Sequence, residues 1–417
     1  MHFHFSFYSS LLLILFSQGM LFSILLFKKG FKVGQQSYYW LSLFIFLCSL
    51  FILPWMLGHA GWYSLQPYRD SMFYIPMQQQ LLIGPVIFFY TQSLLNQSFS
   101  LQKKDWLHLF PAFIYLLYSL LVFITDKLVL QQYFFYANGR DKDLDSWYQM
   151  AGLVSMLVYG LLSIRYYALY KKIIYQATSF ADKLLFNWVK KYLFAFFFMQ
   201  LVMLCLLLFY PRWGSFSQKW WYYFFFACLY YYIALTAYAN QIKSIVFFRA
   251  SNWLNEPVYL LNEYKQPGGL LPLPLIEKEN MLTLDAASAT EKDSLLPELE
   301  DWKQKIAAQM ETEKLYQNPE LTLKELAEKM CSNTAVISKA VNQGFKMNFN
   351  DFVNQYRIKA VKILFKKGEH KTQTLLAIAF ECGFNSKTTF NRAFKKYTGL
   401  SPKEYLSGKN NKIGMDA

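Results

Sequence analysis

The chain of 417 residues is 54% hydrophobic and 20% aromatic, with only 17% charged residues, whereas soluble domains average about 45–50% apolar and about 25% charged residues. These proportions exclude one ordinary soluble domain, and the aromatic content excludes disorder over most of the chain. The net charge of +15 is unevenly spread, because residues 1–249 and 302–417 are basic and residues 250–301 are acidic. This division indicates a membrane domain, a linker and a soluble module that binds something anionic.

Seven apolar segments in the first 249 residues approach the length of about 20 residues that a helix needs to cross a bilayer. We expect these helices at about 5–27, 37–57, 72–95, 106–124, 148–170, 190–210 and 220–241. The third segment is the weakest, because three consecutive glutamines interrupt it. Residues 1–249 are therefore predicted to form a seven-helix transmembrane domain.

Loop charges predict the orientation of these helices. The loops on one side hold twelve Lys and Arg residues, and those on the other side hold six. Because positive residues stay in the cytoplasm, the N-terminus is expected outside and the C-terminus inside. An odd number of helices agrees with this orientation. We thus expect a multi-pass membrane protein whose C-terminus is cytoplasmic.

Polar groups within the apolar segments are candidates for a sensing site. This predicted membrane polar cluster comprises Gln78, Gln79, Gln80 and Gln200. Such groups usually hydrogen-bond between helices, although lining a ligand cavity is the alternative. The longest outer loop, 125–147, contains four aspartates but lacks the Gly and the closing Glu of a calcium loop. It is expected to be a solvated polar loop.

Residues 250–301 change in composition to Pro, Gly, Ser, Ala and acidic residues. Such a segment is predicted to be an acidic flexible linker. A helical periodicity returns from Trp302, which we take as the start of a soluble domain that extends to residue 406. Residues 407–417 form a tail.

Residues 322–344 have the pattern of a helix-turn-helix motif. Thr322 and Glu325 form a capping box, and apolar residues recur on one helical face. After a short break, Asn333 is a good N-cap for a second helix whose outer face is polar, as in DNA-recognition helices. The outward positions are Thr334, Ala335, Ser338 and Lys339.

A second motif of the same kind follows at about 374–397, after a connecting helix at 352–365. Its first helix ends in a turn at Gly383, and Ser386 caps the next helix. The outward positions of that helix are Lys387, Thr388, Asn391 and Arg392. The soluble domain is therefore predicted to contain two helix-turn-helix motifs.

The run 378–405 resembles the signature of AraC-type transcription regulators. The matching residues are Ile378-Ala379, Gly383-Phe384, Ser386, Phe390, Arg392-x-Phe394-Lys395 and Gly399-x-Ser401-Pro402. Residues 348–357 are similar to the same family, but Cys331 stands where a turn glycine is common. The resemblance covers about 302–406, a quarter of the chain. Helices followed by this domain are similar to the arrangement of membrane-bound AraC-like regulators of bacteria.

The resemblance implies that both recognition helices enter adjacent major grooves of double-stranded DNA. The eight outward positions named above would then contact bases, with Lys387 and Arg392 donating to guanine and Asn391 pairing with adenine. The implied phosphate contacts are Lys395, Lys396 and Lys403. The alternative for each single residue is a solvated basic face.

The sequence thus predicts an all-α protein in which a seven-helix transmembrane bundle precedes a cytoplasmic double helix-turn-helix domain. The predicted function is that of a membrane-anchored one-component regulator of transcription. The alternatives are a transporter or channel with a DNA-binding regulatory tail, or a constitutive membrane tether. We expect no enzymatic activity, cofactor or metal. The expected partners are promoter DNA, the lipid bilayer, a second copy in a homodimer, and an unidentified small ligand or membrane protein.

Overall fold

The computed structural model describes residues 4–96, 99–209, 216–239, 248–250, 258–260 and 296–407. The predicted tail (408–417) and most of the predicted linker (261–295) lie outside these residues. The chain divides into two compact units. One comprises Met1–Ala168 and Phe186–Ile245, and the other comprises Leu169–Leu185 and Val246–Ala417. Each unit is described by itself.

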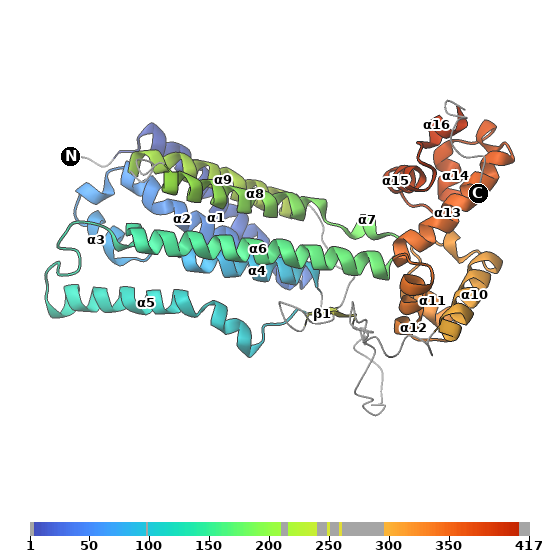
Figure 1. The fold of residues 1–417 in the computed structure, drawn as a ribbon. Coiled ribbons are helices and arrows are strands. Elements are labelled where there is room, and N and C mark those ends of the chain that lie inside the picture. The colour runs from blue at the N-terminus through green and yellow to red at the C-terminus, as the bar shows by residue number, and fades with distance from the viewer. Residues whose placement is uncertain are drawn as a thin grey trace. The chain divides into compact units, whose positions relative to one another are not determined.

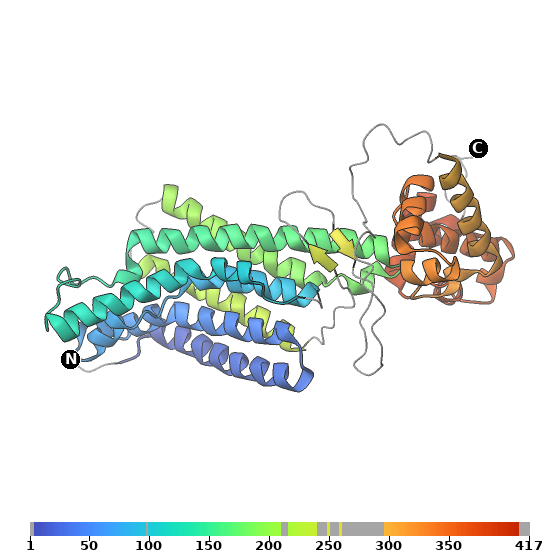
Figure 2. The same cartoon turned by 90° about the horizontal axis from the view of Figure 1, so that it is seen from below.

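The first unit is built from helices, most of which lie alongside one another (Figures 1 and 2). They are α1 (Phe7–Val33), α2 (Gln36–His59), α3 (Tyr68–Tyr74), α4 (Gln80–Leu95), α5 (Phe110–Phe123), α6 (Ser146–Ala177), α8 (Asn187–Phe209) and α9 (Phe216–Ala239). A π-helix, η3 (Ile124–Val129), extends α5. Among the described residues, six helices are long and apolar enough to cross a membrane.

The third expected segment differs from its prediction. Helix α3 ends at Tyr74 and α4 begins only at Gln80, because Pro76 lacks an N–H and the N–H of Gln78 donates to Asp143 Oδ2 (3.1 Å) instead of continuing a helix. The 16 residues of α4 span about 24 Å, less than the roughly 30 Å of a bilayer core. The described residues therefore contain six helices long enough to cross a bilayer and one shorter apolar helix.

Small residues let α1, α2 and α9 approach one another closely. A Cβ added at Gly19 of α1 would lie 2.2 Å from Ser49 Oγ and 2.8 Å from the Tyr230 ring. Nearby, the hydroxyls of Ser23 and Ser42 each donate to the other residue's carbonyl oxygen, at 2.9 and 2.8 Å. Close contacts through Gly and Ser are typical of helices packed within membranes.

The loop 125–147 is solvated only in part. Residues 128–132 and 137–140 are exposed, as the sequence predicts, but Asp126, Asp141 and Asp143 are at most 5% exposed. Tyr63 Oη donates to Asp141 and Tyr115 Oη donates to Asp143, both at 2.5 Å. The prediction is wrong for these three aspartates, because neighbouring tyrosines and backbone N–H groups supply the hydrogen bonds that water would otherwise make.

The second unit contains a helical domain with two hydrophobic cores. Its helices are α7 (Ala181–Leu184), α10 (Leu296–Thr312), α11 (Leu323–Lys329), α12 (Thr334–Lys339), α13 (Phe349–Lys366), α14 (Leu375–Glu381), α15 (Lys387–Thr398) and α16 (Pro402–Leu406). The first core contains Ile306, Leu326 and Phe352, and the second contains Val361, Ile378 and Phe394. Helix α13 contributes to both cores and thereby joins them.

Two details of this unit refine the predicted organisation. Helix α10 begins at Leu296, so the last residues assigned to the linker are helical, and Ile306 and Met310 bury this helix in the first core. One antiparallel pair of short strands, β1 (Phe248–Ala250) and β2 (Val258–Leu260), is also present. The fold is otherwise helical in the described residues, which confirms the predicted all-α class.

Candidate nucleic-acid interface

Both predicted helix-turn-helix motifs are present. Helices α11 and α12 form the first motif, and α14 and α15 form the second. Their N-caps are those expected from the sequence: Thr322 accepts from the N–H of Glu325, Asn333 from that of Val336, and Ser386 from that of Thr389. These caps satisfy N–H groups that a helix start leaves unpaired, so local sequence determines where each recognition helix begins.

The turn of each motif contains a residue with a positive φ, a different residue type in each. Gly383 has φ +91°, and a Cβ there would lie 2.3 Å from the carbonyl oxygen of Tyr316. Cys331 has φ +49° in the first turn, a region that glycine enters more readily. The family resemblance identified Cys331 as an exception, and the structure shows that this cysteine keeps the left-handed turn.

Helix α15 presents the four predicted base contacts on one exposed face. Phe390, Ala393 and Phe394 are buried in the second core, and the opposite side of the helix lies outside that core. The exposed residues on that side are Lys387, Thr388, Asn391 and Arg392. Lys395, Lys396 and Lys403 are exposed as well, and Lys396 Nζ lies 2.6 Å from Asp351 Oδ2.

Helix α12 matches its prediction less well. Lys339 is exposed, and Thr334 and Ala335 are half-buried, but Ser338 is only 2% exposed. The expectation that Ser338 faces outward is therefore wrong in this conformation. Ser338 follows the buried residue Ile337 in α12, so it belongs to the buried side of this helix. Its hydroxyl accepts a hydrogen bond from Asn342 Nδ2 (3.2 Å).

Arg357 joins parts of the domain that are distant in sequence. It is 1% exposed and donates from Nε to the carbonyl oxygen of Tyr316 (2.8 Å) and from Nη2 to that of Asn318 (2.7 Å). Burial lowers the pKa of this guanidinium to about 9. Its neighbours are carbonyl, hydroxyl and amide oxygens, which makes Arg357 a structural cross-link and not part of an exposed basic face.

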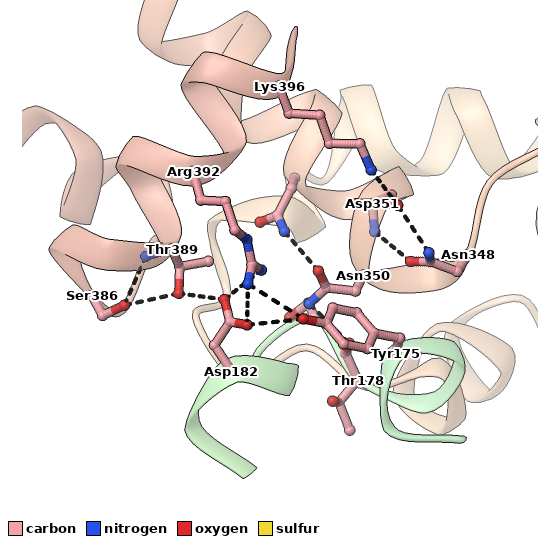
Figure 3. Close-up of polar contacts among 12 residues, drawn as sticks. Tyr175, Thr178, Asp182, Asn348, Asn350, Asp351, Ser386, Thr389, Arg392 and Lys396 are labelled. Carbon is pink, nitrogen blue, oxygen red and sulfur yellow. Dashed lines mark hydrogen bonds and ion pairs between the residues drawn. The ribbon is translucent and has the colours of Figure 1, made fainter. Parts of the chain in front are cut away.

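A carboxylate that sequence reasoning missed lies on the face of α15. Asp182 of α7 accepts two hydrogen bonds from Arg392, from Nη1 to Oδ1 and from Nη2 to Oδ2, both at 2.6 Å (Figure 3). Burial lowers the pKa of Arg392, but the hydrogen bonds and charge of Asp182 outweigh burial and raise it above its usual value. The available signal was that Asp182 is the only acidic residue among the lysines of residues 171–191.

The glutamines of the predicted membrane polar cluster are all buried. Gln80 Nε2 donates to Gln78 Oε1 (3.1 Å), and Gln78 Nε2 donates to the carbonyl oxygen of Phe51 (2.9 Å). Gln79 Nε2 donates to the carbonyl oxygen of Pro76 (2.7 Å), whereas Gln200 accepts from Tyr222 Oη (2.8 Å). These bonds link α2 to the start of α4 and α8 to α9, which supports the interhelical role.

No group of three or more His, Cys, Asp or Glu side chains that could hold a metal ion occurs among the described residues. The exposed side chains of α15 at the candidate interface supply hydrogen-bond donors and positive charge. Such groups bind phosphates and the edges of bases.

Comparison with known proteins identifies the type of DNA-binding domain. Residues 326–408 match the family model described as "Helix-turn-helix domain", and they form a helix-turn-helix domain of the AraC type. An uncharacterized HTH-type transcriptional regulator of Staphylococcus aureus (strain COL) is 31% identical over 91 residues, which are 22% of this chain and 12% of that protein. A protein of the same description from Haemophilus influenzae is 31% identical over 83 residues, 20% of this chain and 27% of its own.

The chain thus aligns with only about an eighth to a quarter of the length of these relatives. No solved structure matches the chain. The family model covers the C-terminal domain, and each of these alignments covers about a fifth of the chain.

Proposed function

We propose that this protein is a membrane-anchored, one-component transcription regulator whose AraC-type domain binds promoter DNA directly. The observation that carries the proposal is the exposed face of α15, where Lys387, Asn391 and Arg392 lie in the first half of a capped recognition helix. The described part of the same chain contains six helices long and apolar enough to cross a membrane. One polypeptide therefore combines both parts that a membrane-bound regulator needs.

In the proposed arrangement, α12 and α15 enter adjacent major grooves. Arg392 and Lys387 donate to guanine, Asn391 pairs with adenine, and Thr334, Ala335, Thr388 and Lys339 complete the base contacts. Lys395, Lys396 and Lys403 hold phosphates and set the register. Ser338 leaves this set, because it is buried.

The proposal includes the topology and the partners. The N-terminus is outside, the C-terminal domain is cytoplasmic in a bacterial inner membrane, residues 1–249 are the sensor and 250–301 are the linker. A homodimer places two domains on one promoter, and the signal is a small ligand or a membrane protein. No observation favours a transporter or a simple tether over this arrangement.

DNA binding by the full chain in lipid nanodiscs tests the proposal. Sequences are first selected from a random duplex library, and binding is then measured by fluorescence anisotropy at several salt concentrations. About six phosphate contacts should give a slope of log K against log salt near −5. The double variant Asn391→Ala/Arg392→Ala should lose sequence preference and keep salt-dependent binding. Salt-insensitive binding, or selection of no common sequence, would contradict the proposal.

A further inference from the structure

Residues 175–183, at the end of α6 and the start of α7, contact the recognition helix α15 at Thr389 and Arg392. We call them the docking segment. They belong to the same compact unit as the helix-turn-helix domain. Figure 3 shows Tyr175 and Asp182 of this segment reaching Thr389 and Arg392 of α15. The segment connects two of the apolar helices, α6 and α8, and its position therefore depends on theirs.

The contact on α15 neutralises a predicted base contact. Asp182 binds Arg392 through two parallel hydrogen bonds of 2.6 Å and accepts a third from Thr389 Oγ1 (2.9 Å). Tyr175 Oη donates to Asp182 (3.1 Å) and accepts from Arg392 Nη1 (3.3 Å). The carboxylate presents two acceptor atoms to the guanidinium. A guanine edge or a phosphate presents two acceptors to an arginine in the same way.

The segment is also anchored away from α15. The N–H of Ser179 donates to the carbonyl oxygen of Leu321 (3.0 Å), next to an isolated antiparallel bridge between Thr178 and Thr322. Arg357 Nη2 donates to Ser179 Oγ (3.1 Å), and Asn350 Nδ2 donates to the carbonyl oxygen of Thr178 (3.3 Å). Ser179 is fully buried. These bonds involve α13 and the start of α11, so the segment is held at several points besides its contact with α15.

We propose that the docking segment is an autoinhibitory element that competes with DNA for α15. Arg392 cannot bind Asp182 and a DNA base at the same time, and the carboxylate adds negative charge where phosphates would come close. Bound DNA must therefore displace at least Asp182, and a rearrangement of α6 or α8 that withdraws the segment would release α15. This inference rests on the proposed function, because it assumes that α15 binds DNA.

Asp182→Asn in the full chain tests the competition. The variant removes the charge and one acceptor, and the full chain in nanodiscs should bind its selected DNA roughly tenfold more tightly, within the usual range of coupling between sites. Glu381→Gln is the matched control, since it makes the same change of charge at an exposed residue of α14 that has no ion pair with the docking segment among the described contacts. Asp182→Glu should restore weaker binding.

Crosslinking tests the contact without relying on DNA binding. Lys183 and Glu320 form an exposed ion pair of 3.6 Å between the docking segment and the helix-turn-helix domain, and neither side chain is a described partner of Arg392. The pair Lys183→Cys/Glu320→Cys, with the exposed Cys205 and Cys331 replaced by Ser, should be joined by a short thiol crosslinker in membranes. Lys183→Cys alone should not be joined. The crosslinked protein should bind DNA at least tenfold more weakly, and prior addition of DNA should reduce crosslinking.

The outcomes separate the two proposals. An Asp182→Asn variant that binds no better than the Glu381→Gln control, or a crosslinked protein with unchanged affinity, would overturn autoinhibition while DNA binding stands. If no variant binds DNA, the proposed function fails and the inference with it, and a crosslink that still forms would identify a structural contact only.

Discussion

At the scale of single residues, charge and exposure distinguish the roles on α15. Arg392 lies near the middle of the recognition helix and is held by Asp182, whereas Lys396 lies one turn later and pairs with Asp351 of α13. We propose that the first side chain reads a base and the second holds the DNA backbone. The two residues therefore predict different mutant behaviour.

Arg392→Ala should cost about 1–3 kcal/mol at one base position and relax specificity there. Lys396→Ala should weaken binding to all sequences by a similar factor and lower the salt slope by about one. Binding of both variants to a library of single-base changes measures the difference. Because Arg392→Ala also frees α15 from Asp182, the comparison uses the pattern across sequences and not the absolute affinity. Identical patterns for the two variants would show that the recognition face is wrongly assigned.

Asp141 and Asp143 predict a pH dependence of the first unit. Burial, and for Asp141 also the charge of its neighbour, raises the pKa of each carboxyl above its ordinary value. A group whose pKa is higher in the folded than in the unfolded state contributes stability below the unfolded pKa and loses it as pH rises through the folded pKa.

The loop that carries Asp141 should therefore exchange its amide hydrogens more slowly at about pH 5 than at about pH 8, once intrinsic exchange rates are divided out. Asp141→Asn should remove most of the difference, since its side chain carries no charge at either pH. The difference in protection between the two pH values is measured by hydrogen exchange of peptides covering 126–145, with the protein in nanodiscs. Greater protection of the wild type at the higher pH would contradict the assignment.

At the scale of elements, the sequence predicted those features that depend on neighbouring residues in the chain, namely the starts of helices and their buried faces. Capping residues such as Thr322, Asn333 and Ser386 gave the starts of α11, α12 and α15, and apolar periodicity gave their buried faces. Sequence failed where distant segments decide the outcome. Ser338 and the aspartates near residue 141 are buried by tertiary neighbours, and the partnership of Asp182 with Arg392 joins residues 210 positions apart, which no local pattern encodes.

The turn of the second helix-turn-helix motif predicts a specific sensitivity. Gly383→Ala should destabilise the domain by at least about 2 kcal/mol, because a positive φ disfavours any side chain and the new Cβ would meet the backbone of Tyr316 and Gln317. Gly399→Ala is the control: its φ is +75°, but nothing lies within 4 Å of the added Cβ, so only about 1 kcal/mol is expected. Hydrogen exchange of peptides from α14 and α15 compares the stability of the two variants. Equal destabilisation by both substitutions would rule out the steric contact at Gly383.

At the scale of the whole molecule, the topology depends on α4. Six helices have the length of a span, and α4 is shorter. If α4 crosses together with the residues before it, seven crossings place the two ends of the chain on opposite sides. If it does not, both ends lie on the same side. The loop charges favour the first arrangement.

Reporter fusions in cells decide the topology. A fluorescent protein that folds only in the cytoplasm should be active when fused after Val33, Asn96 or Ala250, and an alkaline phosphatase at these sites should be inactive. Activity of the phosphatase after Asn96 would show that α4 does not cross. A phosphatase active after Ala250 would place the helix-turn-helix domain outside and would exclude DNA binding in the cell.

The central claim is that a membrane-anchored chain binds specific promoter DNA through α15. Genome-wide mapping of DNA crosslinked to the tagged full chain, recovered from the membrane fraction, tests it most directly, with Asn391→Ala/Arg392→Ala as the matched variant. We predict discrete sites upstream of genes that share one sequence and disappear in the variant, while the amount of protein in the membrane is unchanged. Uniform recovery of DNA along the genome, or the same sites in the variant, would contradict the account.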